Sequence, residues 1–494
     1  MKHLPIAAVI SKEDKDVSRE IADMLEAMSC NKKVFTVATD NEFAAAENVR
    51  SLSLEETHIA IGRSNISRND VRFMPPSRKD GLALALDGYI LDSAGLQHSG
   101  GQPDCEVIGE LIRGRMELSR NLFEAVSLAL PILDGAFSFI SMSGQRVVAA
   151  RDVFGFEPLF WGEDERRVAF ASSRKALWRI GLRNVTHFPP GCIIMAEGEA
   201  KTVSKVLDLD RPRVVDVGLD AAAHRLVETL ASAFSGYRGI EEVGVLFSGG
   251  VDSSVVAKIS GDVGLKPRLY GAAVEGVRDV EVIERSASEL GYGVLLRVIS
   301  VDEAEDYLRK TLLSVEEANL MAATIGLPMY AVMELAAGDG VNRVFSGQGA
   351  DELFGGYARY RRIVGEGNGR LHDAMWHDVT HIGEANLLRD SAIASANNVD
   401  LCLPFLRLGV VDFAMSLPIG LKVRGVEDGL RKHVLREAAK LLGLPKSIVC
   451  MPKKAVQYSS GSEAAIKKLA RSKGENPREY VGRVLREVLR EYIS

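Results

Sequence analysis

The sequence is poor in cysteine and has no paired cysteine motif. Only five cysteines occur among 494 residues, and no two of them are spaced as CxxC. The chain therefore shows neither a disulfide framework nor a zinc-binding pattern, and we expect a reducing, intracellular setting. The five are Cys30, Cys105, Cys192, Cys402 and Cys450.

Long apolar runs and an excess of basic charge are also lacking. No stretch approaches the roughly 18 uninterrupted apolar residues of a membrane-spanning helix. The first apolar run meets charged residues too early for a signal peptide. A formal net charge of −6 gives no electrostatic reason to expect nucleic acid as the main partner. We expect a cytoplasmic protein that acts on small soluble molecules, with no nucleic-acid or membrane partner.

The first half of the chain reads as short strands separated by Gly and Asp turns. Helical periodicity is confined to Val17–Met28 and Pro103–Arg113, so this half predicts an α+β sandwich. A polar, basic segment, Asp208–Val214, ends the pattern, and we place the first domain at 1–207. The predicted strands are His58–Ile61, Leu82–Leu86, Ala136–Met142, Val147–Ala150, Val168–Ala171 and Cys192–Ala196.

The second half alternates strands and helices. After a predicted helix at Leu219–Phe234, strands of buried character are each followed by a helical stretch, which is typical of a parallel α/β sheet. We expect this domain at 215–461 and a charged helical tail at 462–494. The predicted strands are Val243–Phe247, Leu269–Val274, Val294–Ser300 and Arg343–Ser346.

A glycine-rich loop, SGGVDSS, stands between the first of these strands and its helix. Paired glycines let backbone N–H groups turn toward an anion, and the helix N-terminus adds positive charge. Asp252 suits Mg²⁺ better than phosphate itself. A plain strand–turn–helix connection with a polar N-cap is the alternative. The phosphate-binding candidates are Ser248, Gly249, Gly250, Asp252, Ser253 and Ser254.

A second loop of this kind follows the last strand, in the segment RVFSGQGADELFGGY. Ligands of open parallel sheets bind outside the carboxyl ends of the strands, so both loops can face one ATP. Ser346 and Gly347 would then border the nucleotide. Asp252 and Asp351 would each give a carboxylate to Mg²⁺, which neutralises the leaving pyrophosphate.

These loops carry a resemblance to a known family. The first resembles the SGGxDS loop of pyrophosphatase-type enzymes, which cleave ATP between its α and β phosphates, and it is not a Walker A motif. The second is similar to SGEGSDELFGGY of the glutamine-dependent asparagine synthetases. The resemblance continues through Asp400–Leu406, Gly429–Ala439 and Met451–Gly461. It implies an α/β protein, with an Ntn-type sandwich domain followed by a parallel-sheet synthetase domain like the adenine nucleotide alpha hydrolases.

The resemblance also implies roles for single residues. Lys453 corresponds to the family's lysine that stabilises charge during adenylation, although a slip of one residue would select Lys454. Leu246 and Val274, with Gly347, would lie against the adenine and ribose, but ordinary buried strand residues explain the first two equally well. One departure stands out: Gln348 replaces a glutamate that takes a proton from ammonia. An amide cannot act as a general base, so the proton acceptor and the amine stay open.

The first half resembles the family's glutamine-using domain without its reactive group. RDVFGFEPLF and FASSRKAL are similar to family segments, whereas Asp87–Ile90 stands where the family has NGEIYN. The family's nucleophile is a cysteine directly after the initiator Met, but this chain begins Met1-Lys2-His3, and Cys30 lies too far along. We predict that the fold is kept and glutamine is not hydrolysed. A truncated or misassigned start is the alternative.

Together these features predict an AMP-forming carbon–nitrogen ligase that uses ATP and Mg²⁺. The first hypothesis is an ammonia-dependent asparagine synthetase. The second is the same adenylation chemistry on another acid and amine, as in β-lactam synthetase-like cyclases. A third, of another class, is a non-catalytic ATP-binding regulatory protein. The sequence leaves open whether the chain forms homo-oligomers or receives ammonia from a separate source.

Overall fold

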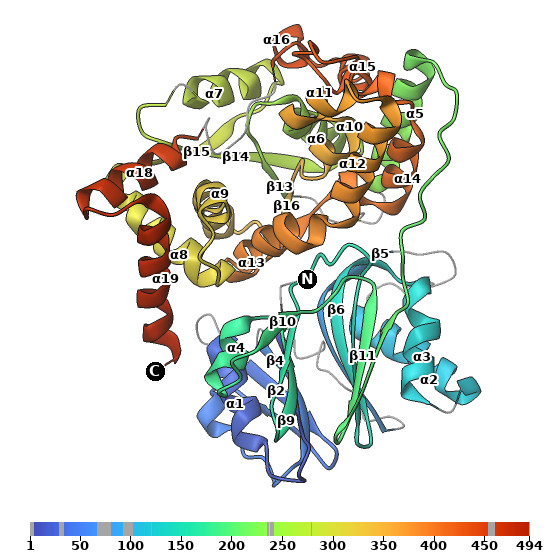
Figure 1. Ribbon diagram of the computed structural model, residues 1–494, viewed down its shortest axis with the longest axis vertical. Coiled ribbons are helices and arrows are strands. Elements are labelled where there is room, and N and C mark those ends of the chain that lie inside the picture. Colours follow the sequence, from blue (N-terminus) through green and yellow to red (C-terminus); the bar gives the residue numbers. More distant parts are fainter. Residues whose placement is uncertain are drawn as a thin grey trace. The chain divides into compact units, whose positions relative to one another are not determined.

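The computed structural model describes residues 4–28, 34–66, 81–91, 102–119, 121–234, 237, 242–277, 279–452 and 460–493. The chain forms two compact units, which are described separately (Figure 1). The first contains Met1–Leu209 with Asn386–Ala396 and Leu485–Ser494, and the second contains Asp210–Ala385 with Asn397–Val484. The predicted domain limits of 1–207, 215–461 and 462–494 are contiguous, whereas these units are not; the limits stay predictions.

The first unit contains two antiparallel sheets. One has the order β10-β8-β9-β1-β4-β2-β3 and the other β12-β11-β7-β6-β5. The strands of the first sheet are β1 (Ile6–Ser11), β2 (Val34–Thr39), β3 (Phe43–Ala46), β4 (Ile59–Ile66), β8 (Phe160–Glu163), β9 (Arg167–Ala171) and β10 (Val185–His187). Those of the second are β5 (Leu82–Leu91), β6 (Asp134–Ser143), β7 (Arg146–Arg151), β11 (Cys192–Glu197) and β12 (Ala200–Lys205).

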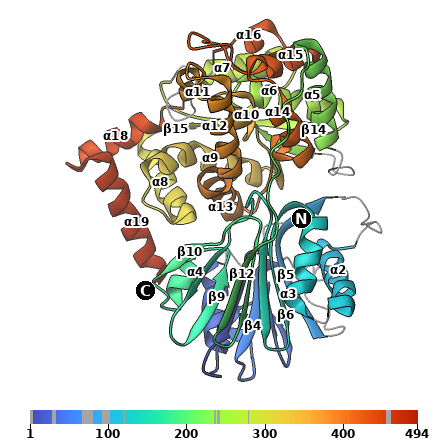
Figure 2. The same ribbon diagram turned by 45° about the vertical axis from the view of Figure 1, so that its right-hand side comes forward.

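The alternation of side chains along β1 shows how the layers are built. Ile6 and Ile10 join a core with residues of the second sheet, while Ala7 and Val9 pack with α1 (Ser18–Met28) and α4 (Arg174–Arg179). Successive strand residues point to opposite faces, so every residue of β1 is buried. On the second sheet, α2 (Asp104–Ser119) and α3 (Leu122–Ala129) cover the outer face (Figure 2). The predicted α+β sandwich is confirmed.

The second unit is built on a parallel sheet of order β15-β14-β13-β16-β17. Its strands are β13 (Glu242–Leu246), β14 (Lys266–Val274), β15 (Val294–Ile299), β16 (Arg343–Phe345) and β17 (Asp400–Cys402). Four of them lie where the sequence predicts strands, and β17 was not predicted. The chain moves from β13 outward to β15 and then returns to β16 on the other side. The strand order therefore reverses beside β13, where such sheets bind ligands.

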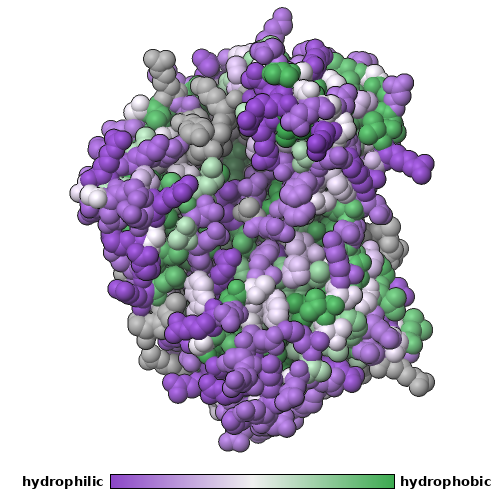
Figure 3. All heavy atoms as spheres, in the orientation of Figure 1, coloured by the Kyte–Doolittle hydropathy of each residue, from purple (hydrophilic) through white to green (hydrophobic). Residues whose placement is uncertain are grey.

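Helices surround this sheet (Figure 1). They include α5 (Leu219–Ala233), α6 (Val251–Asp262), α7 (Asp279–Glu289), α8 (Val301–Val315), α9 (Leu320–Gly338), α10 (Ala350–Phe354), α11 (Ala358–Val364), α12 (Asn368–Thr380), α14 (Leu408–Ser416), α15 (His433–Leu441), α16 (Lys446–Val449) and α18 (Ser462–Ser472). Helix α13 (Leu388–Ala396) belongs to the first unit, and α19 (Pro477–Ile493) is divided between the two units after Val484. Among the described residues, α9 alone is long and apolar enough to cross a membrane by composition, and half of its apolar window is buried within the structure. The coloured residues on the face in Figure 3 carry mostly hydrophilic side chains.

Candidate functional site

The first glycine-rich loop leads from β13 into α6 and is braced by its own serines. The N–H of Ser248 donates to Ser253 Oγ over 3.3 Å, and that hydroxyl donates to the carbonyl of Gly250 over 3.2 Å. Gly249 has φ +74°, and a Cβ there would lie 3.1 Å from the carbonyl oxygen of Val282. A residue with a side chain would therefore be both strained and crowded. These hydrogen bonds fix the loop between the end of β13 and the N-terminus of α6.

Within the described part of the chain, Ser254 leaves one polar group of this loop without a hydrogen bond. Its side chain is fully buried, and its hydroxyl has no hydrogen-bond partner among the described residues. A buried polar group without a partner costs about 1–3 kcal/mol, so such groups need an explanation. A phosphate oxygen at the N-terminus of α6 would satisfy the hydroxyl and the neighbouring N–H groups together. The loop thus fits an anion such as the phosphates of ATP.

The second loop leads from β16 into α10. Gly349 has φ +93°, and a Cβ on it would lie 2.7 Å from the side chain of Leu406, so glycine is required there. The N–H of Gln348 donates to Ser346 Oγ over 3.2 Å, and the N–H of Ser346 donates to the Cys402 carbonyl over 3.0 Å. These bonds tie the loop to its own strand and to β17.

The two loops touch each other because their strands are neighbours. Val245 of β13 pairs with Phe345 of β16, so the next residues of both strands emerge side by side. A Cβ on Gly347 would lie 3.0 Å from the Cβ of Asp252. The structure thus brings together the two predicted loops, at the edge of the sheet where ligand binding was expected.

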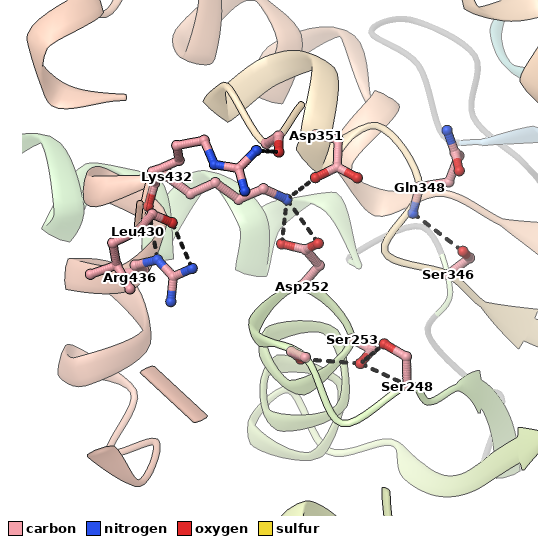
Figure 4. Close-up of polar contacts among 12 residues, drawn as sticks. Ser248, Asp252, Ser253, Ser346, Gln348, Asp351, Leu430, Lys432 and Arg436 are labelled. Carbon is pink, nitrogen blue, oxygen red and sulfur yellow. Dashed lines mark hydrogen bonds and ion pairs between the residues drawn. The ribbon is translucent and has the colours of Figure 1, made fainter. Parts of the chain in front are cut away.

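Asp252 and Asp351 share one cation, and that cation is Lys432 (Figure 4). The Nζ of Lys432 lies 2.8 Å from each carboxylate oxygen of Asp252 and 2.5 Å from Oδ1 of Asp351. The lysine side chain is completely buried, whereas the two carboxylates keep 15% and 21% of their exposure. The two predicted metal ligands therefore lie together and both contact the ammonium group of Lys432, a residue for which the sequence predicted no role. Their binding of a metal stays a prediction.

An unusual backbone brings Lys432 to this position. Arg431 and Lys432 have φ of +55° and +56°, left-handed values that side-chain-bearing residues seldom adopt. The carboxylate of Asp428 accepts N–H bonds from Leu430 over 3.1 Å and from Arg431 over 2.9 Å. Arg436 donates to the carbonyls of Leu430 over 2.9 Å and Arg431 over 2.8 Å. The turn is thus held at both its N–H and its carbonyl groups.

Asp428 makes further contacts that stabilise this turn. It also accepts from the N–H of Arg424 over 2.9 Å and pairs with the Nε2 of His433 over 2.7 Å. Although burial alone raises its pKa, the bonds from Arg431 and Arg424 lower the pKa of Asp428 to about 2. The segment GLRKHVLREAA was noted for its family resemblance, but consecutive left-handed residues other than Gly or Asn carry no sequence signal.

Gln348 acts as a hydrogen-bond donor within the second loop. Its Nε2 lies 3.4 Å from Oε1 of Glu352, an oxygen that also accepts the hydroxyl of Tyr357 over 2.6 Å. Glu352 is fully buried, and burial, followed by the charge of Asp351, raises its pKa to about 7. An amide at 348 can donate to this carboxylate, whereas a glutamate there would face it as a like charge.

The predicted adenine contacts lie at the same edge of the sheet. Leu246 ends β13 half-buried, and Val274 ends β14 with its N–H donating to the Ser460 carbonyl over 2.8 Å. A Cβ on Gly461 would lie 3.2 Å from the Cβ of Val274, so the chain passes close to this strand end. The nucleotide contact itself stays a prediction. Lys453 and Lys454 lie outside the described residues.

The first unit contains a buried polar cluster around Asp87. This carboxylate is completely buried and accepts the N–H of Leu4 over 3.1 Å and the hydroxyl of Ser172 over 2.9 Å. Burial lowers the pKa of nearby Arg63, while Cys105 and Asp87 raise it. Met1–His3 and Cys30 lie outside the described residues. Asp87 thus fixes the chain at the beginning of β1. It belongs to the segment that, by the resemblance, corresponds to the family's NGEIYN motif.

The family-like segment RDVFGFEPLF has a structural role. Arg151 is completely buried and donates to the carbonyls of Gly155, Glu157 and Phe188 over 2.6, 2.7 and 2.8 Å. Asp152 accepts the N–H groups of the same turn. The segment closes one loop of the sandwich without presenting a reactive group.

Comparisons with known proteins match both units. The asparagine synthase family model matches residues 226–370 and 364–492, and the glutamine amidotransferase domain model matches 77–179. A Methanocaldococcus jannaschii protein named as a glutamine-hydrolyzing asparagine synthetase is 33% identical over 431 residues, covering 76% of this chain and 78% of the relative. Asparagine synthetase B of Escherichia coli K12 is 26% identical over 404 residues, covering 76% and 70%.

A solved structure of a glutamine phosphoribosylpyrophosphate amidotransferase from B. subtilis aligns with TM-score 0.34 and 18% identity, covering 55% of this chain and 67% of that one. The expected fold class is confirmed: an Ntn-type amidotransferase sandwich is followed by a parallel-sheet synthetase domain. The chain belongs to the asparagine synthetase family, a family of ATP-dependent carbon–nitrogen ligases.

Proposed function

We propose that this protein is an asparagine synthetase that makes asparagine from aspartate, ATP and free ammonia. The observation that carries the proposal is the convergence of Asp252 and Asp351, from two adjacent loops, on the ammonium group of Lys432. A pair of carboxylates beside an anion-binding loop is what a magnesium nucleotide requires. Membership of the family supports the reaction type, and the geometry of these loops supports the proposed location of the site.

The chemistry begins with an oxygen of the aspartate side chain attacking the α-phosphorus of ATP. The bond from that phosphorus to the oxygen bridging the α and β phosphates breaks, and pyrophosphate leaves. Ammonia then attacks the activated acyl carbon, AMP departs with the electrons of the carbon–oxygen bond, and one proton is lost. Without adenylation the carboxylate has no adequate leaving group.

The residues of the two loops have different roles in this reaction. The N–H groups around Gly249 and Gly250 and the hydroxyl of Ser254 bind phosphate oxygens. Asp252 and Asp351 would hold the metal, and Mg²⁺ there would neutralise charge on the departing pyrophosphate. Lys432, which contacts both carboxylates, would add a further positive charge. Lys453, outside the described residues, keeps the charge-stabilising role that the resemblance implies.

Ammonia rather than glutamine is proposed because of Asp87. Hydrolysis of the glutamine amide passes through an oxyanion, which hydrogen-bond donors stabilise. A carboxylate cannot donate, and its charge opposes the oxyanion. Asp87 is buried and accepts both the Leu4 N–H and the Ser172 hydroxyl. The relatives described above are named as glutamine-hydrolyzing, so this chain is proposed to differ from them in its source of nitrogen.

Gln348 favours a second candidate within the same reaction class. Its amide is engaged as a donor to Glu352 and cannot accept a proton from ammonia. The same adenylation could therefore serve another acid and an amine of lower pKa, as in a β-lactam synthetase-like cyclisation. A screen of candidate acids for pyrophosphate release separates the two.

The decisive experiment measures pyrophosphate release and asparagine formation with aspartate and ATP. Three parallel reactions contain ¹⁵N-ammonium, amide-¹⁵N-glutamine or no amine, and mass spectrometry identifies the product. We expect ¹⁵N-asparagine with ammonium and none with glutamine. Labelled asparagine from glutamine would overturn the ammonia proposal. Pyrophosphate release only with other acids would support the second candidate, and no release with any acid would indicate a non-catalytic ATP-binding protein.

A further inference from the structure

We infer that Lys432 is a built-in counter-ion that occupies the metal position in the nucleotide-free protein and is displaced when the metal nucleotide enters. The inference builds on the proposed function, because it assumes that Asp252 and Asp351 are the metal ligands. It concerns a different property, namely how the protein treats a divalent cation before ATP arrives.

The position of the ammonium group is the first support. Lys432 Nζ lies 2.8 Å from both oxygens of Asp252 and 2.5 Å from Asp351 Oδ1, so it occupies the space between the two carboxylates. A divalent cation bound to both carboxylates would need that same space. Two cations cannot share it, since they would repel each other strongly in a site so little exposed. Metal binding therefore requires the ammonium group to move.

The second support is the electrostatic free energy that the protein would lose if no cation lay between the two carboxylates. Asp252 lies in the first turn of α6 and Asp351 in the first turn of α10, so the helices hold both carboxylates in place. Two ionised carboxylates at this separation, each partly desolvated, destabilise one another. The ammonium group of Lys432, in contact with both carboxylates, offsets that repulsion.

The third support is the division between a fixed backbone and a movable side chain. Asp428 and Arg436 hold the left-handed turn at Arg431 and Lys432, so the lysine backbone stays in place. Strained backbone of this kind is typical of functional sites. The lysine side chain, by contrast, has four rotatable bonds. For the exchange, its end would turn from the carboxylates toward phosphate oxygens of the bound nucleotide while its Cα remains fixed.

Gly356 leaves room for Asp351 and Lys432 to approach each other. A Cβ on Gly356 would lie 1.8 Å from Asp351 Oδ1 and 2.4 Å from Lys432 Cε. Any side chain at this position would force both groups away. The absence of a side chain at Gly356 explains why the carboxylate of Asp351 and the side chain of Lys432 can approach so closely.

The inference predicts that a divalent metal binds weakly on its own and strongly together with ATP. The free cation must break the ion pairs of Lys432 without offering the ammonium group a new partner. The metal nucleotide brings its own phosphate oxygens, which then pair with Lys432. ATP and metal should therefore bind with positive coupling, and Lys432 should be the source of much of it.

The test uses the full-length protein and Mn²⁺, whose free concentration is read by electron paramagnetic resonance. We expect Lys432→Met to bind Mn²⁺ at least about tenfold more tightly than the parent without nucleotide. Lys440→Met makes the same change at an exposed position of α15 and should leave Mn²⁺ binding unchanged. Lys432→Arg, which keeps the charge, should bind Mn²⁺ as weakly as the parent.

Equal or weaker Mn²⁺ binding by Lys432→Met would overturn the inference. A far-ultraviolet circular dichroism spectrum matching the parent shows that the variant is folded. If Lys432→Met does not fold, the test uses the parent protein. Adding ATP to the parent should tighten Mn²⁺ binding well beyond the affinity of ATP alone for Mn²⁺. The absence of this coupling would contradict the inference. Tighter Mn²⁺ binding by Lys432→Met, together with no asparagine formation by the parent protein, would leave the inference standing and reject the proposed function instead.

Discussion

The ammonium group of Lys432 lies 2.8 Å from both carboxylate oxygens of Asp252, although 180 residues separate the two in sequence. This contact joins the first glycine-rich loop to the turn before α15. Asp351 completes the arrangement from the second loop. Three distant segments of one unit thus meet at the carboxyl edge of a parallel sheet.

The charge of Asp252 is expected to be essential for adenylation. In Asp252→Asn the metal loses one of its two proposed carboxylate ligands, and pyrophosphate release should fall by roughly 10²–10³-fold, the usual effect of removing one electrostatic stabiliser. A coupled assay for pyrophosphate, with saturating ATP and acid, measures this. Asp262→Asn removes an exposed carboxylate from the other end of α6, where it pairs with Lys258, and should retain the parent rate. Similar rates for both variants would place the metal elsewhere.

Gly356 should tolerate no side chain. In Gly356→Ala the added methyl group would lie 1.8 Å from Asp351 Oδ1, so the carboxylate must move. Misplacement of a catalytic group by about 1 Å can cost about 10²-fold in rate, and we expect a loss of pyrophosphate release of this order. Gly369→Ala is the matched control, because a Cβ on Gly369, in α12, has open space around it. A Gly356→Ala protein as active as Gly369→Ala would show that Asp351 need not stay where it is.

Much of this site can be predicted from the sequence because its signals are local. Glycines with adjoining Ser and Asp after an apolar strand define the loops at Ser248–Ser254 and Ser346–Glu352. Parallel strands place both loops at one edge, so the convergence of Asp252 and Asp351 also follows. These inferences need only the order of strands and helices along the chain.

The role of Lys432 could not be predicted because its causes are not local. Its position depends on two left-handed residues and on a carboxylate, Asp428, that organises the turn. Lysine normally occupies the surface, so neither Lys432 nor Lys422 signals burial from its identity. The strand β17, with three residues, is too short for its pattern to be recognised. It forms because Arg343–Phe345 offers it a paired edge.

Lys422 is expected to destabilise the second unit at neutral pH. Its side chain is completely buried, and among the described residues its amine contacts only the sulfur of Met415, at 3.9 Å. Burial lowers the pKa of Lys422 to about 7, whereas the unfolded chain keeps a value near 10.4. Between these values the unfolded state binds more protons, so this residue makes stability rise with pH across that window.

The substitution Lys422→Met should therefore raise the free energy of unfolding by about 1–4 kcal/mol at pH 7, as is found when buried charges are replaced by apolar groups of similar volume. The advantage over the parent should shrink as the pH approaches 10. Urea unfolding at both pH values measures it. Lys473→Met alters an exposed lysine and should show no such pH-dependent difference. A constant difference between pH 7 and 10 would mean that Lys422 is not the titrating group.

Asp87 is expected to stabilise the first unit without supporting glutamine chemistry. It is one of the groups that raise the pKa of buried Arg63, and it also accepts bonds from Leu4 and Ser172. In Asp87→Asn the buried guanidinium of Arg63 loses a compensating charge, which should cost about 3 kcal/mol, the upper end for a buried polar group that loses a partner. Ser172→Ala removes the hydroxyl's bond to the same carboxylate and the bond that it accepts from the Ile6 N–H, and should cost about 1–2 kcal/mol. Urea unfolding followed by circular dichroism compares the two variants. Asp87→Asn is also tested with amide-¹⁵N-glutamine: labelled asparagine would show that the carboxylate alone suppresses glutamine use, and its absence would show that removing this charge is not enough to restore it.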